Sequence, residues 1–244
     1  MESQRVVSRE EWLAARQELL GQEKEATRAK DAVDARRRAL PVVEVDKDYV
    51  FAGPDGPASL AGLFGGRRQL IVYHFMWRHA ESGFPDEDQG CPTCSFLADS
   101  IGELSHLHSC DATLVLVSRA PLASIERFRK RMGWQVPWYS SHGSDFNYDF
   151  HVTLDEARGS AEYNYTDANA LKRARKLWMD ELPGLSVFYR EGGDVFHTYS
   201  AYQRGLDHLI NTYNYVDLTP LGRHEGDLEW VQAWIRHHDR YAGV

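Results

Sequence analysis

The stretch Leu70-Ile71-Val72-Tyr73-His74-Phe75-Met76-Trp77, followed by Gly90-Cys91-Pro92-Thr93-Cys94-Ser95, decides the fold. The uninterrupted apolar character of Leu70–Trp77 predicts a buried strand. The second stretch predicts the start of a helix that runs to about Ser109, because apolar side chains follow it near helical spacing. Thr113–Val117 predicts another buried strand and Leu122–Met132 another helix. This alternation predicts a βαβ unit with parallel strands and a right-handed crossover.

The rest of the chain adds elements on both sides of this unit. We expect a helix over residues 8–40, a short strand within Val42–Phe51, an aromatic-rich segment over Trp134–Tyr165, a helix over Asp167–Glu181, a hairpin of Ser186–Arg190 with Val195–Tyr199, and helices over Leu206–Tyr215 and Asp227–Tyr241. The last of these carries His237-His238-Asp239, which we interpret as a solvated part of that helix.

The first expected helix has a narrow apolar face. Ser8 is its N-cap, and apolar residues then recur every seven positions: Trp12, Leu19, Ala26, Val33 and Leu40. One interpretation is a long helix that lies on the domain through this thin face. The other is a contact between two copies of the chain, which would make the protein a homodimer.

The charge balance limits the classes of partner. The 244 residues include 28 Lys and Arg against 36 Asp and Glu, which gives a net charge of −8. We therefore expect neither nucleic acid nor an anionic membrane as a partner. No apolar run reaches membrane-spanning length, and Met1–Arg5 leads into a charged helix without a signal-peptide core, so we expect a cytoplasmic protein. In that compartment, two closely spaced cysteines indicate redox or metal chemistry rather than a structural disulfide.

The Cys-Pro-Thr-Cys motif is suited to thiol chemistry. A thiol in the first turn of a helix lies near unpaired N–H groups and the positive end of the dipole, which favour the thiolate. Pro92 suits the first helical position. Cys91 would attack a substrate disulfide, and Cys94 would resolve the mixed disulfide. Four upstream carboxylates would raise the thiol pKa if they lay close to it in space: Glu81, Asp86, Glu87 and Asp88.

Two other interpretations of the cysteines remain open. Cys91, Cys94 and His197 together offer two thiolates and an imidazole, a set that suits copper or zinc, and such a site could oxidise a small aromatic molecule. The dithiol mechanism requires no cofactor. Alternatively, the pair is inert and the chain is a non-catalytic dimeric binding protein. We interpret His74 as a core histidine and Cys110 as a small core residue.

Several stretches together resemble a bacterial thioredoxin-like family of unknown function, whose members are described as predicted dithiol-disulfide oxidoreductases. The resemblance rests on Glu11–Arg16, Arg37–Pro41, Leu70–Trp77, Gly90–Ser95, Phe196–Ser200 and Asp217–Pro220. It implies an α/β thioredoxin-like fold of the peroxiredoxin kind, with a central mixed sheet flanked by helices.

The resemblance also implies a domain organisation. Residues 1–41 form an N-terminal helical extension, 42–216 the thioredoxin-like domain with an aromatic-rich insertion at about 134–181, and 217–244 a C-terminal helical extension. Pro183 is the positional candidate for the cis-proline that faces the Cys-X-X-Cys motif in this fold, through a cis Leu182–Pro183 bond. The chain departs from thioredoxin at Gly90, where a tryptophan is usual. It also lacks the Pro-x-x-x-Thr/Ser-x-x-Cys motif of peroxiredoxins before either cysteine.

Overall fold

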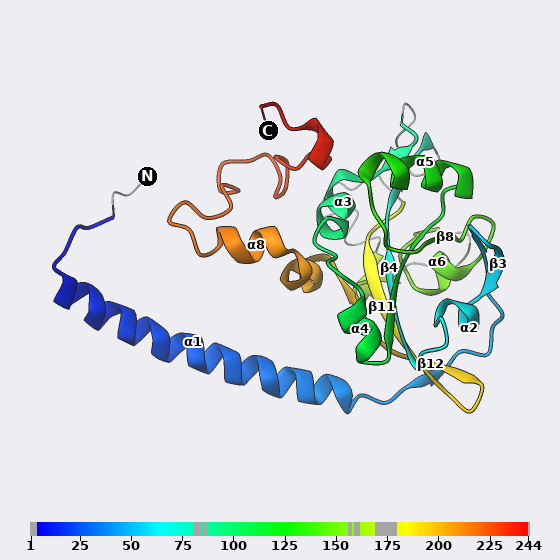
Figure 1. Ribbon diagram of the computed structural model, residues 1–244, viewed down its shortest axis with the longest axis horizontal. Coiled ribbons are helices and arrows are strands. Elements are labelled where there is room, and N and C mark those ends of the chain that lie inside the picture. Colours follow the sequence, from blue (N-terminus) through cyan, green and yellow to red (C-terminus); the bar gives the residue numbers. More distant parts are fainter. Residues whose placement is uncertain are drawn as a thin grey trace. The chain divides into compact units, whose positions relative to one another are not determined.

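A computed structural model describes residues 4–80, 84, 87–155, 158, 162–168 and 180–243 of the chain (Figure 1). The chain forms two compact units, Met1–Pro41 and Val42–Val244. No helix within these described ranges is long and apolar enough to cross a membrane.

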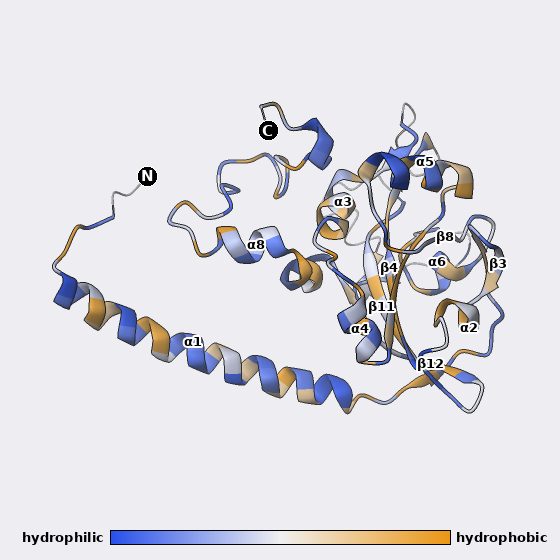
Figure 2. Cartoon of the chain, viewed as in Figure 1, coloured by the Kyte–Doolittle hydropathy of each residue, from blue (hydrophilic) through white to orange (hydrophobic). Residues whose placement is uncertain are grey.

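The first unit is one long helix, α1 (Arg9–Arg38), and the expected helix is thereby confirmed. Ser8 and Glu11 form a capping box: the Ser8 hydroxyl accepts the Glu11 N–H, and the Glu11 carboxylate accepts the Ser8 N–H at 2.9 Å. Three arginines in the last turn face the negative end of the helix dipole. Hydrophilic residues dominate α1 and are interrupted by short apolar segments (Figure 2), and none of its residues is buried.

The second unit is built on an eight-stranded mixed sheet with the order β1-β12-β11-β4-β7-β8-β2-β3. Its strands are β1 (Val43–Glu44), β2 (Val50–Gly53), β3 (Gly56–Ser59), β4 (Gln69–His74), β7 (Ala112–Ser118), β8 (Trp138–Ser140), β11 (Gly184–Glu191) and β12 (Asp194–Tyr202). Strands β4, β7 and β8 are parallel, whereas β11 is antiparallel to both β4 and β12. Two short pairs lie outside this sheet: β5 (Trp77–Arg78) with β6 (Gln89–Gly90), and β9 (Glu162–Tyr163) with β10 (Thr166–Asp167).

Short helices connect and cover the strands. They are α2 (Leu60–Leu63), α3 (Pro92–Ala98), α4 (Ser105–Ser109), α5 (Leu122–Met132), α6 (Phe146–Asp149) and α8 (Asn211–Val216), with 3-10 helices at Gln203–Leu209 and His238–Arg240. The order β4–α3–β7–α5 followed by the β11–β12 hairpin, with β11 beside β4, is that of a thioredoxin-like core. The expected α/β thioredoxin-like fold with a central mixed sheet is confirmed.

Side chains alternate along the strands and divide the core into two faces. Tyr73 on β4 and Leu185 on β11 belong to one apolar cluster, which also contains Cys91 and Cys94; we call this side the cysteine face. Leu70 and Val72 in β4 belong to the other cluster, with aromatic side chains from α6 and β11; we call this side the aromatic face. The sheet thus separates two buried environments.

One expected helix is shorter than predicted, and another is absent. The helix from the cysteine motif ends at Ala98 and a separate helix, α4, follows, because Asn211 donates two hydrogen bonds to Ser100, one to its Oγ and one to its C=O, each at 3.0 Å. The expected C-terminal helix over Asp227–Tyr241 is replaced by turns and the 3-10 helix, because both Ile235 and His237 are buried, a spacing of two that one helix face does not provide.

Two further expectations meet the structure only in part. The helix over Leu206–Tyr215 is divided into a 3-10 helix and α8, since Ile210 between them has an extended backbone. Of the expected helix over Asp167–Glu181, Asp167 lies in β10 and Glu181 forms a β-bridge with Thr153, while residues 169–179 lie outside the described residues.

Candidate active site

The end of the central strand and the cysteine motif meet through a short ladder. Trp77 in β5 pairs with Gly90 in β6, and the N–H of Cys91 donates to the C=O of Met76 at 3.1 Å. Cys91 is the N-cap of α3, with Pro92 at the first helical position, where its missing N–H is of no consequence. Both cysteines are free and buried, with exposed fractions of 3% for Cys91 and 1% for Cys94. The structure therefore brings together the two residues that the sequence identifies as the catalytic pair.

The peptide between Met76 and Trp77 is held from both sides. Its C=O accepts the Cys91 N–H, and its N–H donates to the carboxylate of Glu181 at 3.2 Å. Glu181 is itself buried, and Arg119 Nη1 donates to its other oxygen at 3.3 Å. Sequence reasoning missed Glu181, because nothing near it in the chain marks it as a partner of the motif. Its position relative to the cysteines is a product of the tertiary fold.

Gly90 is required by the aromatic side chains around it. A Cβ at this position would lie 2.6 Å from the Phe128 ring and 2.9 Å from the Phe75 ring, closer than real contacts allow. The Gly90 C=O lies 2.8 Å from His237 Nε2 in the C-terminal segment. This crowding explains why glycine stands where thioredoxin has a tryptophan. It also corrects the interpretation of His237, which is buried beside the motif rather than solvated.

The surroundings of Cys91 favour its thiolate. A hydrogen bond from the Cys94 thiol is the largest cause that lowers the pKa of Cys91 to about 5, while burial opposes it. The positive charge of Arg78 and the hydroxyl of Thr93, whose Oγ1 lies 3.2 Å from Cys91 Sγ, lower the pKa further. The sequence contained one signal for a role of Arg78. This residue directly follows the apolar stretch Leu70–Trp77, and ligand sites in α/β sheets lie at the carboxyl ends of such strands.

Cys94 has the opposite character. Burial raises the pKa of its thiol well above the usual range, and the hydrogen bond and charge of Cys91 raise it further. Bonds from the Tyr73 hydroxyl and the Met76 backbone act in the other direction. At neutral pH the pair thus holds one thiolate on Cys91 and one proton on Cys94, a division that suits a nucleophile and a resolving thiol.

A thiolate at this site should be detectable by its absorbance at 240 nm. In reduced protein carrying Cys110→Ser, we expect one thiolate to form with a midpoint near pH 5 as the pH rises, because the folded pKa of Cys91 is lowered. Arg78→Gln should move the midpoint upward, since it removes a nearby positive charge. Arg127→Gln is the matched control, because that arginine bonds to Asp88 and not to a thiol. A native midpoint at the usual thiol value of about 8.5 would contradict the assignment.

The two described carboxylates of the acidic loop are not among the causes that raise the pKa of Cys91. Of its four carboxylates, Glu81 and Asp86 lie outside the described residues. Glu87 forms an ion pair with Arg78 at 3.4 Å, and Asp88 accepts the Trp77 indole N–H at 2.8 Å. Their charges are therefore engaged by partners, and the net shift of Cys91 is downward.

The proposed third metal ligand, His197, lies on the aromatic face. Its ring contacts Phe150 and Phe188 with centroid distances of 5.2 and 5.5 Å, and its Nε2 lies 2.8 Å from Ser200 Oγ. The cysteines lie on the other face of the sheet. The set Cys91, Cys94 and His197 is therefore not brought together, and across the described part of the chain no three His, Cys, Asp or Glu residues are grouped to hold a metal ion.

His74 is a core histidine, as expected. Its Nε2 lies 2.9 Å from Ser186 Oγ, which in turn lies 2.9 Å from Ser200 Oγ, so a polar chain joins His74 to His197 across three strands. Its ring stacks on Phe146 at 5.3 Å. Burial lowers the pKa of His74 to about 3 and also lowers that of His197, so both rings are neutral at physiological pH.

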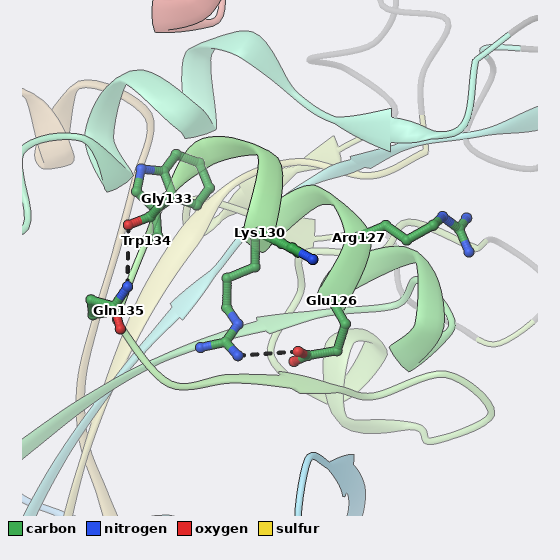
Figure 3. A pocket seen from close by; sticks show the side chains of 7 residues that line it. Glu126, Arg127, Lys130, Gly133, Trp134 and Gln135 are labelled. Carbon is green, nitrogen blue, oxygen red and sulfur yellow. Dashed lines mark hydrogen bonds and ion pairs between the residues drawn. The ribbon is translucent and has the colours of Figure 1, made fainter.

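The aromatic-rich segment is mostly packing. Phe146 and Phe150 fill the aromatic face, whereas Trp134 and Trp138 pack against Phe75 on the cysteine face. Figure 3 shows a hollow beside the C-terminal end of α5, where Trp134 is accompanied by charged and polar side chains. Its lining is Glu126, Arg127, Arg129, Lys130, Gly133, Trp134 and Gln135. Such a lining does not match the apolar pocket expected for an aromatic substrate.

Two smaller expectations are wrong. Cys110 is exposed rather than part of the core, because it forms the C-cap of α4 in the turn before β7. The Leu182–Pro183 bond is trans, since no cis peptide bond occurs within the described ranges. In this conformation the Pro183 C=O accepts the Tyr163 hydroxyl at 2.7 Å.

The strand order and the dithiol at the start of α3 define a thioredoxin-like α/β protein. The family model described as "Bacterial protein of unknown function (DUF899)" matches residues 1–241, and the chain belongs to this family. The resemblance noted from the sequence is confirmed.

Solved structures show a low level of similarity. The chain is 13% identical to Peroxiredoxin Q from Xanthomonas campestris, with a TM-score of 0.45, covering 67% of this chain and 85% of that chain. It is 14% identical to Peroxidoxin BcpB from Mycobacterium tuberculosis (TM-score 0.43, 72% and 97% covered). It is 11% identical to a putative thiol:disulfide interchange protein DsbE from Chlorobium tepidum (TM-score 0.40, 71% and 97% covered). None of the curated proteins compared with the sequence matches it.

Proposed function

We propose that the protein is a dithiol-disulfide oxidoreductase in which Cys91 is the nucleophile and Cys94 the resolving thiol. The observation that carries the proposal is the unequal state of the two sulfur atoms, with the pKa of Cys91 lowered to about 5 and that of Cys94 raised. A buried pair that served only packing would gain nothing from a nearby arginine and a hydrogen-bonding threonine.

The reaction follows from these two states. The Cys91 thiolate attacks one sulfur of a substrate disulfide, and the other substrate sulfur leaves as a thiolate that takes up a proton. Cys94 then loses its proton and attacks Cys91 Sγ, which breaks the mixed disulfide and releases the second substrate thiol. The substrate is reduced by two electrons, and Cys91 and Cys94 become a disulfide. An external dithiol returns the pair to its reduced form.

Burial of both sulfur atoms restricts the substrate. With Cys91 only 3% exposed, a disulfide on the surface of a folded protein reaches it less easily than a small or extended disulfide. We therefore propose a low-molecular-weight disulfide as the substrate class. A pair that must be returned to its reduced form suits the reducing cytoplasm, which we propose as its working compartment.

Thiol counting tests the disulfide cycle. The chain has three cysteines. Treatment of the reduced protein with a small disulfide should remove two thiols and leave Cys110. In protein carrying Cys110→Ser the same two thiols should disappear, and peptide mapping should show a Cys91–Cys94 bridge. Retention of all thiols, or a bridge that includes Cys110, would reject the proposal.

A further inference from the structure

Glu181 is a buried carboxylate whose contacts lead toward the cysteine motif. The exposed fraction of its side chain is 3%, and its Oε2 accepts the Trp77 N–H at 3.2 Å. Its other oxygen, Oε1, lies 3.3 Å from Arg119 Nη1 and 3.5 Å from His79 Nε2. These distances are at the long end of the range for hydrogen bonds, so the contacts offset little of the cost of burying a carboxylate. A contribution to stability therefore does not account for a charged residue at this position.

The backbone on both sides of Glu181 is held by the segment that follows α6. The Leu154 N–H donates to the C=O of Asp180 at 2.7 Å. The Leu182 N–H donates to the C=O of Val152 at 2.9 Å. Val152, Leu154 and Leu182 also belong to one small buried apolar cluster. The carboxylate of Glu181 is thus attached to a part of the backbone that has a fixed position.

One peptide group transmits this position to the nucleophile. The N–H that Glu181 accepts belongs to the Met76–Trp77 peptide, and the C=O of the same peptide accepts the Cys91 N–H at 3.1 Å. The two bonds strengthen each other, because a carboxylate that accepts the N–H makes the C=O a better acceptor. Trp77 also pairs with Gly90, the residue before Cys91. Glu181 is therefore connected to Cys91 through two successive hydrogen bonds.

The same peptide determines where Arg78 lies. Arg78 directly follows Trp77 and pairs with Gln89 in the ladder of β5 and β6. Its positive charge is one of the causes that lower the pKa of Cys91. The charge of Glu181 is not among the causes that shift this pKa. An effect of Glu181 on the thiolate would therefore come from the positions of Cys91 and Arg78.

We propose that Glu181 is a positioning residue, which fixes Cys91 and Arg78 relative to each other through the Met76–Trp77 peptide. The role rests on the proposed function, in which Cys91 is the nucleophile. Glu181 acts through the hydrogen bond that it accepts and not through its negative charge. A neutral acceptor at the same distance can therefore replace it, whereas a carboxylate that does not reach Trp77 cannot.

Glu181→Gln and Glu181→Asp separate position from charge. The glutamine keeps an oxygen at the same reach but loses the charge, and the aspartate keeps the charge on a side chain that is one methylene shorter. In reduced protein carrying Cys110→Ser, the 240 nm thiolate midpoint of the glutamine variant should stay within about 0.3 pH units of the unmodified value, whereas the aspartate variant should raise it by about one unit. At pH 5 the aspartate variant should then react with iodoacetamide about fivefold more slowly, because less of Cys91 is ionised.

Arg119→Gln is the control for a general loss of stability. It removes a partner of Glu181 Oε1 but leaves the bond to Trp77, so it should lower the Tm without moving the thiolate midpoint. Circular dichroism verifies that each variant is folded. A native midpoint in Glu181→Asp would overturn the proposal, as would a shift of the same size in Glu181→Gln or Arg119→Gln. Neither measurement uses a disulfide substrate, so an absence of disulfide turnover would reject the proposed function alone.

Discussion

Cys91→Ser is expected to lower the steady-state reduction of a small disulfide, such as hydroxyethyl disulfide, by about 10³-fold or more. The change removes the atom that forms the mixed disulfide, and a serine hydroxyl at this place is not ionised near neutral pH. The shape of the site should be retained, because serine is close in size to cysteine. The measurement is turnover with excess dithiothreitol, corrected for the direct reaction of the reductant.

Two control variants separate the roles of the cysteines. Cys94→Ser should also abolish turnover, but it should retain the first step and accumulate one equivalent of mixed disulfide on Cys91, which intact-mass spectrometry detects. Cys110→Ser should change turnover less than twofold, because this cysteine is exposed at the far end of α4. Trapped substrate on Cys94 in the Cys91→Ser protein would reverse the assignment of the two roles.

Gly90→Ala is expected to destabilise the protein by about 3 kcal/mol, at the upper end of the usual cost of overpacking. The added methyl group would lie 2.6 Å from the Phe128 ring, which also contacts Trp77, Trp138 and His237 and therefore has little room to move. For a chain of this size the change corresponds to a fall in Tm of roughly 6 to 12 °C. Thermal unfolding followed by circular dichroism measures it.

Gly102→Ala is the matched control for this substitution. No atom lies within 4 Å of a Cβ at Gly102, and its backbone is not in the left-handed region, so the same chemical change should leave Tm equal or slightly higher. If both variants unfolded at the same temperature as the unmodified protein, the crowding around Gly90 would not constrain this position.

Local patterns in the sequence were sufficient for the core of the fold and for the position of the two cysteines at the start of a helix. The strand within Leu70–Trp77 is recognisable because it is almost entirely apolar, and the start of α3 because Pro92 suits the first helical position. The two glycines Gly192 and Gly193 are a local turn signal, and they mark the hairpin of β11 and β12. In each case the deciding interaction lies within a few residues of the signal.

Contacts between distant segments could not be predicted in this way. His237 and Glu181 reach the site from positions far along the chain, and neither has a neighbour that indicates its partner. His197 was assigned to the cysteines because it lies on the hairpin, but the irregular register between Val187 and Phe188 and the side-chain alternation of the sheet place it on the aromatic face. Cys110 was expected in the core because of its apolar flank, yet the turn that ends α4 exposes it.

The contacts of Cys91 and Gly90 with late parts of the chain have a consequence for biosynthesis. The peptide that accepts the Cys91 N–H is anchored by Glu181, and the residue before Cys91 is contacted by His237, which follows much later in the chain. At usual rates of translation, ribosomes need roughly 7 to 30 s to proceed from Cys91 to His237. During that interval the nascent chain carries two cysteines without their final surroundings. The packing around the cysteine motif is therefore complete only after His237 has been synthesised.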